Sequence, residues 1–424
     1  MVSSHPEVLV AGAGPVGMFA ALALAKRGIE VQIVDSALQP ATHSYALALH
    51  SRSMQLLEAA GLYESVMVES YPVHRAGLYD ENGRKAELTI GDGSPGAGLA
   101  VLRQDVLEEY LEAALADIGV EVLWSHRLSR AVANDEFVGA TVEALEKESR
   151  GYAVAHTEWV VADTKELRPR YVIGADGHSS WVRRSLRIGF PEVAKPQYFA
   201  VFEFASDADP AHEMRIVFAD GTTNVMWPIP EGHVRWAFEL RSYLARGTTR
   251  EKDRFAVQVD AGEYPILTEE RLRTLLAERA PWFTGGVGEI TWRIVVRFER
   301  RLAESFGGDR MWLAGDAAHL TGPAGVQSMN SGLAEASDLA SIIAASLGGE
   351  DVRERFADHD SSYRERWKTL LGVNGAIQAS SSADPWVVKY AAALLPCLPG
   401  IGNEAVNLAR QLGVGFGRSC TAGS

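Results

Sequence analysis

The sequence has little cysteine and no excess of positive charge. Only Cys397 and Cys420 occur in 424 residues, and neither lies in a C-x-x-C pair or a Cys/His cluster. This excludes a disulfide framework, predicts no metal site and favours a reducing, cytoplasmic compartment. Lys and Arg number 41 against 55 Asp and Glu, a net charge of −14. We therefore expect no nucleic-acid partner, because binding to phosphate backbones needs a basic surface.

The sequence also lacks an uninterrupted apolar run that could span a bilayer. The run from Val8 to Ala25 contains several glycines and has no basic segment before it, which predicts folded structure and not a signal peptide. The run from Trp386 to Ile401 is interrupted by Lys389 and two prolines. We expect no integral membrane segment there, but a C-terminal helix packed on the body; a helix lying on a membrane surface is the alternative.

The N-terminal 35 residues carry a nucleotide-binding pattern. An apolar strand over 7–11 leads into Gly12-Ala-Gly-Pro-Val-Gly17, a helix follows over 18–27, and a second strand over 30–34 ends at Asp35. Such glycines permit a tight turn and close backbone approach, the helix N-terminus receives a pyrophosphate, and the acidic residue accepts from ribose hydroxyls. The pattern predicts a dinucleotide site without distinguishing NAD from FAD.

Strands and helices stop alternating after this unit. Period-two apolar runs over 76–87 and 199–240, the second broken by the turns Asp220-Gly221 and Glu231-Gly232, predict antiparallel sheet. We expect a helix over 105–118, buried strands over 171–177 and 311–316, and a helix over 325–347. The nucleotide-binding unit is therefore interrupted by sheet segments and then resumed.

Three motifs in this order resemble the class A flavoprotein monooxygenases, the family of para-hydroxybenzoate hydroxylase. The first is the glycine turn already described. The second, Asp176-Gly-His-Ser-Ser-Trp-Val-Arg183, is similar to the family's D-G-x-x-S-x-h-R motif, where h is apolar. The third, Gly315-Asp-Ala-Ala-His319, is followed by Pro323, Gly325 and the pair Met329-Asn330, as in the family's G-D-A-A-H motif and the helix that contacts the flavin.

The resemblance implies an α/β fold with a Rossmann-like FAD-binding domain, a mostly antiparallel β-sheet substrate domain and a helical C-terminus. We expect the discontinuous FAD-binding domain to comprise 1–75, 100–185 and 295–347, the sheet domain 76–99 and 186–294, and the helical region 348–424. Arg103-Gln104 matches a position that contacts FAD in the family, with a solvated helix start as the alternative. The expected cofactor-binding residues are Gly12, Gly14, Pro15, Val16, Gly17, Asp35, Arg103, Gln104, Asp176, Gly177, Arg183, Gly315, Asp316, Pro323, Gly325, Met329 and Asn330.

One position departs from the family. Many members read R-A-x-x-L-H-x-R after the second strand, and here the stretch begins with Tyr45 and runs to Arg52. Tyr45 replaces the arginine near the pyrophosphate and the flavin edge, so that contact cannot be transferred to this chain. His319 invites a general-base role, but the resemblance places it in a structural motif, and no catalytic residue is assigned.

The activity implied by the resemblance is hydroxylation of a small aromatic or heteroaromatic molecule through a flavin C4a-hydroperoxide, consuming NADPH or NADH and O₂, by a monomer or homodimer. Aromatic residues of the sheet could line a dry pocket; Phe202, Phe218 and Trp227 are the candidates, although aromatics more often simply pack a core. Met226-Trp-Pro-Ile-Pro230 carries half of a halogenase motif, which leaves a flavin-dependent halogenase as an alternative. A non-catalytic flavin- or ligand-binding homologue is the other.

Overall fold

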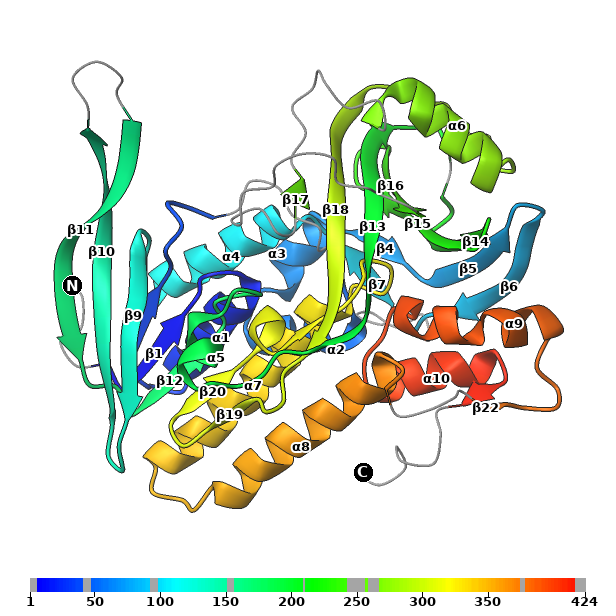
Figure 1. Ribbon diagram of the computed structural model, residues 1–424. Coiled ribbons are helices and arrows are strands. Elements are labelled where there is room, and N and C mark those ends of the chain that lie inside the picture. Colours follow the sequence, from blue (N-terminus) through cyan, green and yellow to red (C-terminus); the bar gives the residue numbers. More distant parts are fainter. Residues whose placement is uncertain are drawn as a thin grey trace.

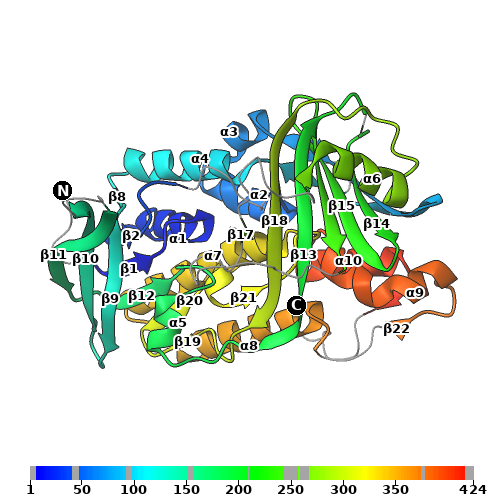
Figure 2. The same ribbon diagram turned by 45° about the horizontal axis from the view of Figure 1, so that its top comes forward.

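The chain folds around two large sheets (Figures 1 and 2). This computed structural model describes residues 6–40, 47–91, 98–150, 156–208, 210–241, 256–257, 267–373 and 378–415. The α/β class expected from the sequence is confirmed, since both sheets carry helices. No helix in these ranges is long and apolar enough to cross a membrane.

The first sheet is parallel apart from one edge strand, and its strand order is β19-β20-β12-β1-β2-β8. The inner strands β1, β12 and β20 are fully buried, as their continuous apolar runs predict. On β1, Val8 and Val10 pack against helices, while Leu9 and Ala11 pack against the opposite layer. The strands are β1 (Val8–Ala11), β2 (Val31–Val34), β8 (Val122–Leu123), β12 (Tyr171–Gly174), β19 (Gly307–Gly308) and β20 (Met311–Leu313).

Helices cover one face of this sheet, and a three-stranded antiparallel sheet covers the other. The helical layer consists of α1 (Pro15–Ala25), α4 (Gln104–Asp117) and α7 (Gln327–Leu347), with α2 (Ser51–Ala59) and α3 (Tyr63–Val68) beside it. The opposite layer contains β9 (His126–Ala133), β10 (Val138–Arg150), β11 (His156–Leu167), the short α5 (Trp181–Ser185) and α8 (Arg353–Leu370), which runs beside α7 (Figure 1).

The second sheet is antiparallel except for the β14–β5 pair. Asp220 and Gly221 both have positive φ, 51° and 62°, and close the β14–β15 hairpin, as the Asp-Gly signal predicts. The strands are β5 (Arg75–Asp80), β6 (Gly83–Thr89), β13 (Glu192–Ala205), β14 (Glu213–Ala219), β15 (Thr222–Ile229), β16 (His233–Leu240), β17 (Ala256–Val257), β18 (Ile290–Leu302) and β21 (His319–Leu320).

The two faces of the second sheet have different neighbours (Figure 1). Helix α6 (Glu269–Arg279) packs on one face, against Phe202 and Phe204 of β13. Phe199 and Val201 point to the other face, toward the C-terminal helices. The C-terminal helices are α9 (Pro385–Leu394) and α10 (Asn403–Gln411). A small sheet of β3 (Ala48–Leu49), β7 (Leu99–Val101) and β4 (Tyr71–Val73), and the strand pair β22 (Gln378–Ala379) and β23 (Val414–Gly415), lie on the same side.

The C-terminal apolar run packs on the body, as expected. Val387, Ala391 and Leu394 of α9 are buried in the same cluster as Phe218 and Trp227 of the second sheet. These three side chains of α9 are used for packing on the body, whereas Val388 of the same helix is exposed.

Candidate cofactor and substrate site

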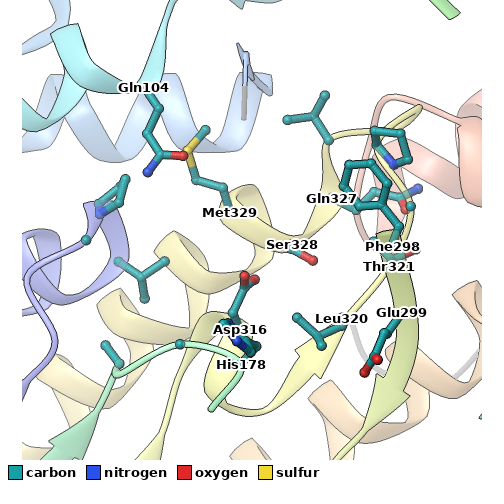
Figure 3. A pocket seen from close by; sticks show the side chains of 18 of the residues that line it. Gln104, His178, Phe298, Glu299, Asp316, Leu320, Thr321, Gln327, Ser328 and Met329 are labelled. Atoms are coloured by element: carbon teal, nitrogen blue, oxygen red, sulfur yellow. The ribbon is translucent and has the colours of Figure 1, made fainter. Parts of the chain in front are cut away.

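A cavity of about 370 Å³ lies between the carboxyl end of the parallel sheet and β18 (Figure 3). This is the edge at which open α/β sheets bind ligands. The walls come from the glycine turn, the loop after β12, the segment from β20 to α7, and β18. The residues that line the cavity are Gly14, Pro15, Val16, Gln104, Ala175, Gly177, His178, Val296, Phe298, Glu299, Ala314, Asp316, Leu320, Thr321, Gly322, Pro323, Val326, Gln327, Ser328 and Met329.

The glycines of the first turn have different tasks. A Cβ on Gly12, whose φ is +102°, would lie 2.2 Å from the Ala175 carbonyl oxygen, and a Cβ on Gly17 would lie 1.9 Å from the Gly12 carbonyl oxygen. Both are therefore needed for packing of the turn. Gly14, by contrast, lines the cavity, and among the residues that the structure describes no atom comes within 4 Å of a Cβ added there. Its open space fits the close approach of a ligand to the backbone.

Helix α1 begins beside this open space without a side-chain cap. Gly14 is the N-cap and Pro15 occupies the first turn, with no acidic residue there. The uncapped N–H groups and the helix dipole favour an anion such as a pyrophosphate. The site therefore fits the group that the glycine motif predicts.

Asp35 follows β2 and holds the glycine turn. Its Oδ2 accepts from the Ala13 N–H at 2.7 Å, and its Oδ1 accepts from the Ala37 N–H at 2.7 Å. Each carboxylate oxygen keeps a further lone pair for a ribose hydroxyl. The ribose role of Asp35 stays a prediction, and the structure adds a structural role.

Asp176 and Arg183 hold loops and do not line the cavity. The Oδ2 of Asp176 accepts from the N–H groups of Trp181 and Val182, at 2.6 and 3.0 Å, at the start of α5. Arg183 is buried and donates to the carbonyl oxygens of Ala317 and His178, at 2.7 and 2.8 Å. The motif thus fastens the loop after β12 to the turn after β20, and only Gly177 and His178 of this motif reach the cavity.

Burial leaves Asp176 partly unsatisfied. Its Oδ1 has no hydrogen-bond partner within the described ranges, and desolvation raises the pKa of this carboxyl above its ordinary value. The direct FAD contact predicted for Asp176 stays a prediction; the observed contacts belong to the α5 cap.

Asp316 points into the cavity from a 3₁₀ turn over Gly315–Ala317 (Figure 3). The side chain is exposed to the cavity but surrounded by protein. This desolvation raises the pKa of Asp316 to about 6; His319 opposes the rise and Glu335 adds to it. A carboxylate there accepts from hydroxyl groups, which would offset its lost hydration. The site thus fits the ribityl chain of a flavin.

Sequence reasoning missed Glu335, the residue that fixes this turn. Glu335 lies on α7 with no exposed surface and accepts from the Gly315 N–H at 2.9 Å and from His319 Nε2 at 2.8 Å. Ser331 Oγ and Trp367 Nε1 also donate to it, at 2.7 and 3.2 Å. Burial alone raises the pKa of Glu335, but His319 and these donors hold it below its ordinary value. The signal in the sequence was a glutamate within the mostly apolar stretch that forms α7, because a buried glutamate needs hydrogen-bond partners.

His319 is therefore structural, as expected from the motif. Its ring stacks on Trp367 with centroids 3.9 Å apart, and its Nε2 is bonded to Glu335. Neither His319 nor Glu335 lines the cavity. A general-base role for His319 has no geometric support.

The start of α7 is anchored by Asn330. Its Oδ1 accepts from the His50 N–H and the Ser53 hydroxyl, at 2.7 and 2.6 Å, and its Nδ2 donates to the carbonyls of Ala48 and Val326, at 2.8 and 2.7 Å. The Asn330 side chain is consequently engaged inside the protein. The cofactor contact predicted for Asn330 would therefore have to be made by its backbone.

Val326, the N-cap of α7, has left-handed backbone angles, φ 49° and ψ 42°, which are unusual for a β-branched residue. No side chain caps the helix, and Val326, Gln327, Ser328 and Met329 line the cavity. Free N–H groups at this helix start favour a ligand atom that carries partial negative charge.

His50 ties α2 to the same helix start. Its Nε2 bonds to the Gly325 carbonyl oxygen at 2.9 Å, and its burial lowers the pKa of the imidazole to about 4, against the opposing effect of that bond. Because this pKa is lower than in the unfolded chain, the unfolded chain binds more protons below pH 6.5, and stability falls as the pH drops from 6.5 toward 4.

We expect His50→Gln to reduce acid sensitivity. Glutamine can donate to the same carbonyl without titrating, so wild type should lose about 2 kcal/mol more than the variant between pH 7 and pH 5. Urea unfolding at both pH values measures this difference. If both proteins lost the same free energy of unfolding between pH 7 and pH 5, His50 would not be a neutral buried imidazole.

Arg103 and Gln104 separate in the structure. Gln104 lines the cavity and donates to Glu108 at 2.6 Å. Arg103 does not line it, but donates to Glu203 Oε2 at 3.3 Å, and Glu203 is buried with Arg235 on the second sheet. This ion pair joins the start of α4 to β13. The solvated alternative for Arg103 holds only in part, since its side chain is 44% exposed.

The three candidate substrate aromatics do not line the cavity. Phe202 lies on the far face of the second sheet, packed beneath α6, because alternation on β13 sends Phe199 and Val201 to the cavity side. This placement argues against the role assigned to Phe202. Phe218 and Trp227 lie on the same face of the second sheet as the cavity, but they pack with α9. Phe298 of β18 is the aromatic that lines the cavity.

Four expected positions remain. Pro323 and Met329 line the cavity, and Gly315 forms its turn with a φ of +64°. Gly325 lies beneath the wall: a Cβ there would come within 2.8 Å of the Gln327 amide and of the Leu398 carbonyl oxygen. Tyr45 lies outside the described residues.

Together, the fold and this cavity define a flavin-type nucleotide site. Residues 5–371 match the family model described as "FAD binding domain", and the chain belongs to this family. The resemblance predicted from the three motifs is thereby confirmed, and FAD is the cofactor of the family.

Curated relatives are oxygenases. The chain is 27% identical over 411 residues to 6-methylpretetramide 4-monooxygenase of Streptomyces rimosus, covering 96% of this chain and 66% of that protein. It is 25% identical to 3-(3-hydroxy-phenyl)propionate/3-hydroxycinnamic acid hydroxylase of Shigella sonnei, covering 88% and 62%. The chain thus spans about two thirds of the length of these relatives.

Solved structures share the fold. The p-nitrophenol 4-monooxygenase of Pseudomonas putida DLL-E4 superposes with a TM-score of 0.66 at 19% identity, covering 92% of this chain and 93% of that one. The aklavinone-11 hydroxylase, solved with FAD and aklavinone, gives 0.60 at 23% identity, covering 88% and 66%.

Proposed function

We propose that the protein is an FAD-dependent monooxygenase that hydroxylates a small aromatic molecule with NAD(P)H and O₂, in the cytoplasm, as a monomer or homodimer. The observation that carries the proposal is the single cavity that joins the open glycine turn, Asp316 and the uncapped start of α7 to the apolar residues of β18. Groups suited to a nucleotide and an apolar surface that includes Phe298 thus share one cavity, which supports the proposal.

Each part of FAD has a matching group. The N-terminus of α1 beside Gly14 would hold the pyrophosphate, Asp35 the ribose, and Asp316 the ribityl hydroxyls. The N–H groups that open α7 would stabilise negative charge on the flavin ring. When bound, FAD supplies the redox chemistry, taking electrons from NAD(P)H and activating O₂.

The remaining residues keep the site dry and shaped. Val296, Phe298, Leu320 and Met329 present apolar surface to the cavity. Exclusion of water keeps activated oxygen from being lost as H₂O₂ before it reaches the substrate. We assign the FAD-binding domain to 1–75, 100–185 and 295–347, the substrate domain to 76–99 and 186–294, and the helical region to 348–424. These bounds do not follow the sheets, because β18 of the second sheet crosses the boundary at 294/295.

The relatives suggest the kind of substrate. Their names refer to 6-methylpretetramide and to 3-(3-hydroxy-phenyl)propionate, and the aklavinone-11 hydroxylase was solved with FAD and aklavinone. We infer that this chain also accepts a phenolic or polycyclic aromatic ring.

The proposal is tested with purified protein loaded with FAD. We expect a yellow protein whose flavin is bleached anaerobically by NADPH or NADH without a partner reductase, with faster NAD(P)H oxidation when a phenolic compound is present. Product analysis should show one added oxygen atom. A protein that takes up no FAD contradicts the proposal; incorporation of chloride with externally reduced flavin would support a halogenase, and reduction without turnover a ligand-binding homologue.

A further inference from the structure

Two exposed histidines lie side by side where the small sheet meets the second sheet. His74 stands between β4 and β5, and His212 directly precedes β14, whose parallel pairing with β5 starts at the next residues, Arg75 and Glu213. The ring centroids of the two histidines lie 5.8 Å apart, with the ring planes tilted by 39°. The His74 N–H donates to the His212 carbonyl oxygen at 2.9 Å, so the backbone holds the two residues together.

The backbone and two neighbours orient the ring of His212. Ala211 and His212 both have positive φ, 50° and 57°, in the left-handed region. The His212 ring stacks on Tyr71 with centroids 5.0 Å apart, and its Nδ1 bonds to the Pro72 carbonyl oxygen at 2.8 Å. A carbonyl oxygen only accepts, so Nδ1 carries the proton and the neutral ring offers Nε2 as a lone-pair donor. Histidines that bind metals are typically fixed in this way through their second nitrogen.

The ring of His74 has room to turn toward His212. A Cβ on Gly98 would lie 3.0 Å from His74 Nδ1, so the missing side chain of this glycine leaves space for the imidazole. Among the described residues, neither nitrogen of the His74 ring nor Nε2 of His212 makes a hydrogen bond. Both rings therefore have a nitrogen available for a ligand.

The separation of the rings fits one shared metal ion. Zn–N bonds measure about 2.0–2.1 Å and the ring centre lies about 1.2 Å further, so two imidazoles on one tetrahedral ion have centroids about 5–6 Å apart. The observed separation of 5.8 Å falls in this range. Water would complete the coordination, because the described residues contain no group of three or more His, Cys, Asp or Glu side chains that could hold a metal.

The surrounding charges permit a cation. Arg75 lies beside the pair, with its Nη2 donating to the Ala211 carbonyl oxygen at 2.8 Å and its Nη1 4.0 Å from Glu87 Oε2, which partly offsets its charge. The chain as a whole carries a net charge of −14, and its field attracts cations. Two imidazole ligands favour divalent transition metals, whereas Ca²⁺ and Mg²⁺ require oxygen ligands.

We propose that His74 and His212 bind a divalent transition-metal ion such as Zn²⁺ or Cu²⁺ at the surface, where the small sheet meets the second sheet. The bound ion joins the β4–β5 segment to the start of β14. Sequence motifs do not reveal this pair, because the two histidines lie far apart in the chain. The site is independent of the proposed function, since neither histidine lines the cavity.

The test is calorimetric titration of the FAD-loaded protein, purified without a histidine tag, with Zn²⁺ and separately with Mg²⁺. Wild type should bind one equivalent of Zn²⁺ more tightly than Mg²⁺. His74→Gln and His212→Asn should each lower the Zn²⁺ affinity at least about ten-fold, because loss of a ligand costs no less than loss of a residue that orients one. Asparagine replaces His212 because it tolerates positive φ.

His233 provides the matched control. It is also exposed, and its Nδ1 bonds to the Glu231 carbonyl oxygen at 3.0 Å, as His212 does to Pro72. His233→Gln should leave Zn²⁺ binding unchanged. Zn²⁺ should raise the melting temperature of wild type and of this control, but not of His74→Gln or His212→Asn. With Cu²⁺, electron paramagnetic resonance should show two imidazole nitrogens in wild type and fewer in these two variants.

Several results would overturn the proposal. Equal Zn²⁺ affinity in wild type, His74→Gln and His212→Asn would place the bound ion elsewhere, and no binding by wild type would remove the site. Partial losses that add up in the double variant would indicate two separate histidines, because two ligands of one ion act as a unit. Mg²⁺ binding as tight as that of Zn²⁺ would show attraction by charge alone.

Discussion

Replacing Glu335 by glutamine should destabilise the protein by about 3–5 kcal/mol and weaken FAD binding. Glu335 receives four donors, from Gly315, His319, Ser331 and Trp367, at a site with no exposed surface. Glutamine replaces one carboxylate oxygen by an NH₂ group, which turns a donor toward donors that have no other partner. Losing a buried carboxylate that accepts four hydrogen bonds has a cost of this size, because buried donors are left unpaired.

The effect on FAD follows from the position of the Gly315 N–H. Its bond to Glu335 fixes the turn that presents Asp316 to the cavity. A loosened turn lets the Asp316 carboxylate move away from the place where ribityl hydroxyls are expected. Flavin affinity should therefore fall along with stability.

Ser331→Ala provides the matched control on the same helix. It removes one donor to Glu335 but leaves the His319 bond intact, and should cost about 1 kcal/mol. Urea unfolding and FAD titration of both variants measure the two effects. A Glu335→Gln protein as stable as Ser331→Ala would show that the pair does not carry the turn.

The local motifs could be predicted because they depend on near neighbours. The glycine turn, the strand before it and the acidic residue after β2 follow from chain geometry over a few residues. Boundaries shifted slightly: α1 begins at Pro15 and not at Met18, since proline suits the first turn, and α7 begins at Gln327 and not at Gly325.

The roles of buried polar residues could not be predicted in the same way. Asn330 and Arg183 were expected to contact the cofactor, but their side chains bond to Ala48 and Ala317, far away in the sequence. Only the packed fold shows which partners a polar side chain meets. The same holds for Phe202, because a strand alternates between faces and the sequence does not say which face meets the cavity.

Gly17→Ala should prevent stable folding, with a loss of more than about 4 kcal/mol, whereas Gly14→Ala should spare the fold and impair FAD binding. A Cβ on Gly17 would lie 1.9 Å from the Gly12 carbonyl oxygen, an atom of the backbone that cannot rotate away. Relief would require α1 to move off the turn and off β12. Losses of this size arise where a packed backbone has no room to relax.

The Gly14→Ala variant separates an effect on packing of the turn from an effect on the approach of the ligand. The Gly14 φ of −74° suits alanine, and its added Cβ meets no protein atom within 4 Å. The methyl group would nevertheless enter the cavity beside the N-terminus of α1, where the pyrophosphate is expected. Circular dichroism melting and FAD titration of the two variants decide the matter. Normal FAD affinity in Gly14→Ala would mean that the phosphates lie elsewhere, because no described residue opposes a methyl group at that position.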